Sequence, residues 1–68
     1  MKLQLWQERE KRGWPREYVA KKVGVTSETI RLLETGHRKP SYDVLVKLLD
    51  LYGYKDPRQL FAVADKGI

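Results

Sequence analysis

Residues 16–36 read REYVAKKVGVTSETIRLLETG, a pattern that predicts two short helices joined by a tight turn. Apolar residues repeat at helical spacing on both sides of Gly24, and Thr26 is a natural N-cap for the second helix. Two helices cross closely through such a turn when a small residue lies at their contact and a flexible residue lies in the turn. Ala20 and Gly24 meet these two demands. The predicted inward positions of the pair are Val19, Ala20, Val23, Val25, Ile30 and Leu33.

Helical patterns also flank this pair on its N-terminal side. Residues 3–12 form a charged segment whose apolar residues have helical spacing, and Gly13 closes it. Pro15 suits the first position of the helix that follows, because a proline there loses no intrahelical hydrogen bond. We expect Trp6 and Trp14 to be core aromatics, since nothing spaces them as a base-stacking platform.

Two further helices and no strand are predicted toward the C-terminus. Ser41 caps a helix that ends before Gly53, and Asp56 caps a fifth helix, with Pro57 at its first position, that runs to Ala64. The fourth helix carries an apolar stripe, predicted to face the core, of Tyr42, Leu45, Leu48, Leu49 and Tyr52. Because no linker interrupts the elements, we predict an all-α fold and one domain over residues 1–68.

The composition excludes several classes of protein. The chain has 68 residues, no Cys and one His, which leaves neither a disulfide framework nor the ligand set of a structural zinc site. No carboxylate cluster or His pair offers metal or general-base chemistry, so we expect no enzyme activity, no metal and no cofactor. No apolar run reaches the length of a signal peptide or a membrane span, and a cytoplasmic location is expected.

The positive charge of the chain is concentrated in one region. The formal net charge is +5, and residues 9–39 hold nine Lys and Arg against four Glu, which accounts for all of it. A solvated surface mixes both signs, so an excess in one region favours an anionic partner. Nucleic acid is favoured over a membrane surface.

The chain resembles the helix-turn-helix proteins of the phage repressor and Cro family, also called the xenobiotic-response-element family. The motif occupies residues 16–36, and the resemblance extends from about Leu3 to Phe61. Its other features are Arg9 and Gly13, Glu34-Thr35-Gly36, the basic loop His37-Arg38-Lys39, Pro40-Ser41 and the helix from Tyr42 to Tyr52. The resemblance implies a lambda-repressor-like fold of five helices that usually acts as a dimer on two DNA half-sites. It also implies a partly buried ion pair between Arg9 and Glu34.

By this resemblance, the second helix of the motif enters the major groove, where its N-terminal turn faces base edges. Its outward residues are Ser27, Glu28, Arg31 and Leu32. Ser27 either contacts a base edge, with little discrimination between bases because its hydroxyl can donate or accept, or is only solvated. Glu28 either accepts a hydrogen bond from a cytosine amino group or only stabilises the helix start through the dipole. Arg31 either reaches a guanine edge or a phosphate, or pairs with a glutamate one turn away. Leu32 either meets a thymine methyl group or packs against a neighbouring helix.

Residues on either side of that helix are predicted to bind DNA phosphates. They are Arg16, Thr26, His37, Arg38 and Lys39. The family usually begins its motif with Ser or Thr followed by Gln, whereas this chain has Pro15 and Arg16, so a side-chain N-cap is lost. A phosphate docked at this helix start would offset the cost, because helix N-termini attract anions. The alternatives are an Arg16 held by Glu17 and a basic loop that is only solvated.

The fourth and fifth helices carry more apolar residues than one core stripe needs. The surplus consists of Val44, Val46 and Leu51, with Leu60, Phe61 and Val63 from the fifth helix. An exposed apolar patch here would form a two-fold homodimer contact. Alternatively, the fifth helix covers the surplus within one chain. We favour the dimer, because recognition of a half-site by one small module tends to be weak.

These observations predict a sequence-specific binder of double-stranded DNA, a transcriptional repressor or regulator that acts by occupying an operator. The competing interpretation is a protein-interaction module on the same scaffold, which Glu28 and the apolar Leu32 on the outward face favour. An antitoxin that binds both DNA and a toxin protein lies between the two.

Overall fold

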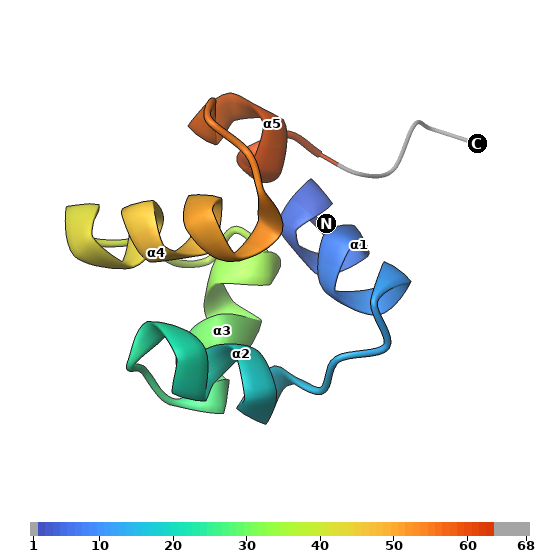
Figure 1. Cartoon of the computed structure of the whole chain (residues 1–68), viewed down its shortest axis with the longest axis vertical. Helices are drawn as coiled ribbons and strands as arrows, with labels where there is room; N and C mark the ends of the chain where they lie inside the picture. The colour runs from blue at the N-terminus through green and yellow to red at the C-terminus, as the bar shows by residue number, and fades with distance from the viewer. Residues whose placement is uncertain (1, 64–68) are drawn as a thin grey trace.

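The computed structural model describes residues 2–63, which form five helices. In chain order they are α1 (Gln4–Lys11), α2 (Arg16–Val23), α3 (Ser27–Glu34), α4 (Tyr42–Tyr52) and α5 (Pro57–Phe61). α2 packs on α3 and α4, while α1 packs on α3 and α5 (Figure 1). No strand occurs in this part of the chain, so the predicted all-α fold is confirmed.

Side-chain caps start three of the helices where the sequence predicted them. Thr26 Oγ1 accepts a hydrogen bond from the Thr29 amide at 3.2 Å, and Ser41 Oγ accepts one from the Val44 amide at 3.3 Å. Asp56 caps α5 in the same way. Pro15 was predicted at the first position of α2, but it is the N-cap of that helix, with an extended backbone and no side-chain cap bond. Arg16 therefore becomes the first residue of α2.

The fifth helix is shorter than predicted. It ends at Phe61, and the predicted end, Ala64, lies outside the described residues. Ala62 is extended, and its carbonyl accepts a hydrogen bond from the Gln4 amide at 2.8 Å. Val63 then forms an isolated antiparallel bridge with Leu3. Pairing with the start of α1 thus satisfies backbone groups that a further helical turn would have used.

The predicted inward face of α2 and α3 is confirmed. Five of its residues are buried: Val19, Ala20, Val23, Ile30 and Leu33. Val25 is half-buried and packs against the same core. Trp14 also packs against the core, as predicted, and stacks on Tyr52 with the ring centroids 5.8 Å apart. Trp6 lies half-buried outside this core, with the Lys2 ammonium 4.2 Å from its ring centroid, so its assignment to the core was wrong.

The core stripe of α4 was predicted only in part. Leu48, Leu49 and Tyr52 reach the core as predicted, whereas Tyr42 is 80% exposed and Leu45 is outside the core. Val44 and Leu51, predicted as surplus, pack against the core in their place. Both the predicted and the observed sets have helical spacing, so the sequence pattern of α4 does not choose between them. Packing against α2 and α5 makes that choice.

A buried charge network holds the first three helices together. The ion pair implied by the resemblance is present: Arg9 Nε donates to Glu34 Oε2 at 2.6 Å. Arg9 Nη1 also donates to the Trp14 carbonyl at 2.7 Å, in the connection before α2. Arg16 Nε donates to the other carboxylate oxygen of Glu34 at 3.2 Å. Glu34, buried at the end of α3, therefore binds one arginine from α1 and one from α2.

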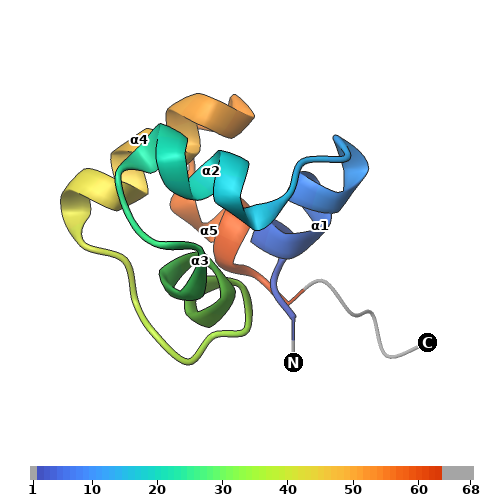
Figure 2. The same ribbon diagram turned by 90° about the horizontal axis from the view of Figure 1, so that it is seen from below.

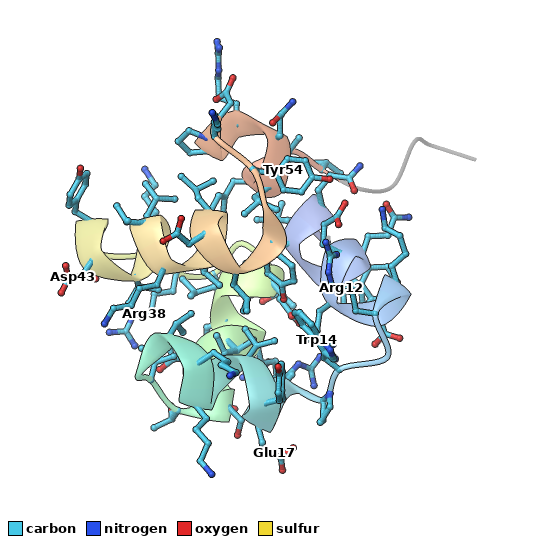
Figure 3. The ribbon with its side chains drawn as sticks, viewed as in Figure 1. Arg12, Trp14, Glu17, Arg38, Asp43 and Tyr54 are labelled. Atoms are coloured by element: carbon cyan, nitrogen blue, oxygen red, sulfur yellow. The ribbon has the colours of Figure 1, made fainter. Side chains whose placement is uncertain are left out.

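A second buried carboxylate was not predicted. Glu8 of α1 accepts hydrogen bonds from the Tyr54 hydroxyl and from Arg12 Nη1, both at 2.6 Å. The two donor residues, Tyr54 and Arg12, are labelled in Figure 3. Lys11 Nζ donates to it as well, at 3.2 Å. Burial alone would raise the pKa of Glu8, but the bonds from Tyr54, Arg12 and Lys11 outweigh it and lower the pKa to about 2. Glu8 therefore joins α1 to the connection between α4 and α5.

Acid should weaken this connection. Because the pKa of Glu8 in the folded protein lies below its ordinary value of 4.5, its stabilisation is complete above pH 4.5 and is lost as the pH falls toward 2. Glu8→Gln is expected to lower the free energy of unfolding at neutral pH by about 1–3 kcal/mol and to flatten the acid limb of the stability curve. Urea unfolding across the pH range measures both effects. Glu17→Gln is the control, and an identical acid limb in the two variants would exclude Glu8 as its source.

Candidate nucleic-acid interface

The outer face of α3 is accessible. Glu28 and Arg31 are exposed, as predicted, whereas Ser27 and Leu32 are half-buried. Thr26, the predicted phosphate contact before the helix, is exposed, and its hydroxyl is used as the N-cap. The first two turns of α3 therefore expose two charged side chains, Glu28 and Arg31, while Ser27 and Leu32 are partly covered.

The turn after α3 sets the path of the basic loop. The Gly36 amide donates to the Leu33 carbonyl at 3.3 Å, and the His37 amide donates to the Leu32 carbonyl at 3.0 Å. These two hydrogen bonds together form a Schellman cap, which needs a residue in the left-handed backbone conformation. Gly36 adopts that conformation, with φ +79°. The loop that follows α3 then crosses to α4 (Figure 2).

The three predicted phosphate contacts in this loop are all exposed: His37, Arg38 and Lys39. Neither Arg38 nor Lys39 lies in an ion pair with a carboxylate of residues 2–63. His37 Nδ1 lies 2.8 Å from Thr35 Oγ1, which orients the ring. A hollow of about 350 Å³ beside the loop includes Arg38, Lys39 and Thr29. Thr29 was not predicted as a site residue, because only the folding of the loop toward α3 brings it there.

A second, open hollow lies between the starts of α2 and α3. Its volume is about 240 Å³, and it is lined by Arg16, Glu17, Ser27, Glu28 and Arg31. Four of these were predicted site residues, and the structure brings them together. Glu17 appeared in the sequence analysis only as a partner for Arg16. In Figure 3 it lies well apart from Arg38, and this hollow shares no lining residue with the hollow beside the basic loop.

The two regions differ in charge. The hollow contains two arginines and two glutamates, so its formal charge is zero. Arg16, which is 38% exposed, does not pair with Glu17 as one alternative held, but with Glu34. The loop His37-Arg38-Lys39 contains no acid. The outer face of α3 is therefore electrically balanced at its start and cationic at its end.

Arg31 and Glu28 form a two-pronged ion pair on this face. Arg31 Nε donates to Glu28 Oε1 at 3.1 Å, and Arg31 Nη2 donates to Glu28 Oε2. The bond from Arg31 lowers the pKa of Glu28, and the same bond raises the pKa of Arg31. Both side chains are therefore charged at neutral pH. The predicted pairing of Arg31 with a glutamate one turn away therefore occurs in the protein without DNA, and the partner is Glu28.

A family model described as helix-turn-helix matches residues 7–60, which include α2, the turn and α3. The chain belongs to the helix-turn-helix family. This confirms the resemblance stated above and the five-helix fold that it implied. An HTH-type transcriptional regulator, AnsR, from Bacillus subtilis (strain 168) is 36% identical over 44 residues. These residues are 65% of this chain and 38% of AnsR, so the chain spans less than half of that relative.

No solved structure matches this helix-turn-helix chain significantly. The family and the similar regulator together support placing this chain among DNA-binding proteins. Within residues 2–63, no helix combines the length and the apolar character needed to span a membrane. The same residues contain no group of three His, Cys, Asp or Glu placed to hold a metal ion.

Proposed function

We propose that this chain binds double-stranded DNA in a sequence-specific manner and acts in the cytoplasm as a transcriptional repressor that occupies an operator. Residues 1–68 form one DNA-binding domain in this proposal. α3 lies in the major groove, with Ser27, Glu28, Arg31 and Leu32 toward the base edges. Repression then follows from occupancy alone and needs no catalytic group.

The observation that carries the proposal is the charge pattern around the exposed face of α3. The first turns of α3 are electrically balanced, and the helix leads at its far end into a loop with two exposed cations, Arg38 and Lys39, that have no ion pair within residues 2–63. Base edges are neutral and phosphates are anionic, so a balanced centre beside a cationic flank suits a groove bordered by phosphates.

Phosphates are bound on both sides of the groove in this proposal. Arg38 and Lys39, with His37, bind the backbone that passes the end of α3. Arg16 and Thr26 bind the backbone that passes the starts of α2 and α3. α2 has no side-chain N-cap, so the amides of its first turn are open to an anion. The Arg16 side chain remains 38% exposed while it binds Glu34, and it can therefore also reach a phosphate at this helix start.

Two copies bind one operator in this proposal, with α4 and α5 forming the contact. An open hollow of about 360 Å³ lies where α4 and α5 meet the loop before α4. It is lined by Pro40, Leu45, Pro57 and Phe61, together with the cations Lys39 and Arg58. Tyr42 and Val46 of α4 and Val63 after α5 are also exposed. Apolar surface that one chain leaves exposed can be buried against the same surface of a second copy in a two-fold interface.

A protein partner at the same hollow is the second candidate function. The apolar lining of the hollow fits it as well as it fits a second copy. An interaction module or an antitoxin would use that surface whether or not α3 binds DNA.

Selection of bound fragments from a random duplex library tests the proposed function. We expect the wild-type protein to enrich one sequence pattern, because α3 presents discriminating side chains to the groove. Two inverted copies of that pattern would indicate binding as a dimer, and one copy would indicate a monomer. A library that returns no pattern, with no binding to any duplex at low salt, would overturn the DNA-binding proposal and favour the protein-interaction module.

A further inference from the structure

We propose that Glu28 positions Arg31 to read a guanine and keeps it off the DNA phosphates. This inference rests on the proposed function and adds the base that the operator must contain. Glu28 is a positioning residue here, and Arg31 is the residue that touches the DNA.

The geometry of the ion pair divides the Arg31 guanidinium into two edges. The inner edge, Nε and one N–H of Nη2, is occupied by the two carboxylate oxygens of Glu28. The outer edge, Nη1 and the second N–H of Nη2, has no hydrogen-bond partner among residues 2–63. Arginine carries five N–H donors in a rigid plane, so holding the inner edge also fixes the direction of the outer one. Two parallel donors on one edge match the O6 and N7 acceptors of guanine in the major groove.

The charge of the pair decides between guanine and phosphate. An unpaired arginine is attracted to a phosphate over a long distance, whereas the Arg31–Glu28 pair has no net charge. A phosphate approaching Arg31 would also meet the repulsion of the Glu28 carboxylate. The O6 and N7 atoms of guanine carry no formal charge, so the carboxylate does not repel them, and the bond to them still comes from a charged donor.

The rest of the hollow leaves this pair undisturbed. Arg16, the other cation in the hollow, donates to Glu34 and does not compete for Glu28. Glu17, the other acid, has no ion pair with a base in the described part of the chain. Arg31 is 44% exposed and Glu28 63%, so a base edge can reach the pair from solvent.

The test begins with the sites that the library selects. We expect a guanine at one fixed position in each half-site, and replacing it with 7-deazaguanine removes the N7 acceptor alone. That replacement is expected to weaken wild-type binding several-fold and to leave binding by Arg31→Ala unchanged. Replacing the guanine with adenine should weaken wild-type binding roughly 5- to 150-fold, the range for one two-pronged base contact.

Glu28→Gln separates positioning from simple charge. The glutamine keeps the shape of the side chain, but the pair changes from no net charge to +1, and Arg31 becomes available to phosphates. We expect a smaller preference for guanine over 7-deazaguanine, tighter binding to unselected duplex, and a salt dependence steeper by about one phosphate contact per protomer. Glu17→Gln removes an equal charge from the same hollow and should keep the wild-type preference.

Failure of the proposed function and failure of this inference give different results. If no duplex is selected, the DNA-binding proposal fails. If a duplex is selected but 7-deazaguanine affects wild type and Arg31→Ala alike, or if Glu28→Gln keeps both the full guanine preference and the wild-type salt dependence, only the role of this pair is overturned. Circular dichroism spectra of all variants confirm that they are folded before binding is compared.

Discussion

Glu34→Ala is expected to unfold most of the protein. Glu34 is 1% exposed and its carboxylate binds Arg9 and Arg16, so its removal leaves Arg9, 5% exposed, without its buried counter-ion. Breaking a buried pair by removing one partner costs about 3–5 kcal/mol. A core of this size supplies only about 3–5 kcal/mol in total. Helical circular dichroism during urea unfolding measures the loss.

Two further variants make this result interpretable. Glu28→Ala removes an exposed acid from the same helix and should leave the unfolding midpoint nearly unchanged, because exposed ion pairs contribute little. The double variant Arg9→Met with Glu34→Met replaces both charges with apolar side chains and should recover much of the lost stability. If Glu34→Ala unfolded at the same urea concentration as Glu28→Ala, the buried pair would not hold α1 to α3 as we infer.

Raising the salt concentration fourfold is expected to weaken DNA binding by about a thousandfold. The proposal gives each protomer three phosphate-binding cations, Arg16, Arg38 and Lys39, and about six phosphate contacts to a dimer. Each contact contributes about 0.9 to the slope of the logarithm of affinity against the logarithm of salt concentration. The expected slope for the dimer is therefore about −5. Fluorescence anisotropy with the selected duplex measures it.

The basic loop should account for most of this slope. Arg38→Ala with Lys39→Ala is expected to reduce its magnitude by about two contacts per protomer and to weaken binding to all duplexes alike, because phosphates carry no sequence information. Lys47→Ala with Lys55→Ala removes the same charge from exposed positions outside the proposed contacts and should retain most of the slope. Equal loss in both double variants would mean that overall charge, and not the loop, governs binding.

Local patterns made part of the site predictable. Thr26, Gly24 and Gly36 mark the ends of the two motif helices, and their roles as N-cap and left-handed turn residues depend only on neighbouring backbone. The exposure of Glu28 and Arg31 follows from the inward positions of Ile30 and Leu33, which the helical period determines. The pairing of Glu28 with Arg31 was one of the stated alternatives, since residues three apart on a helix are neighbours.

The sequence by itself determined that there are five helices within residues 2–63, the side-chain caps of α3, α4 and α5, the buried face of α2 and α3, and the region that carries the excess charge. These properties arise from interactions between residues close in the chain or from simple counting. Only the tertiary structure decided which apolar residues of α4 reach the core, that Glu8 is buried and binds Tyr54, and that Arg16 binds Glu34. Each of these joins residues far apart in the chain, where several partners satisfy the same local pattern. The packing of all five helices selects among them, because it alone determines which side chains lose their contact with water.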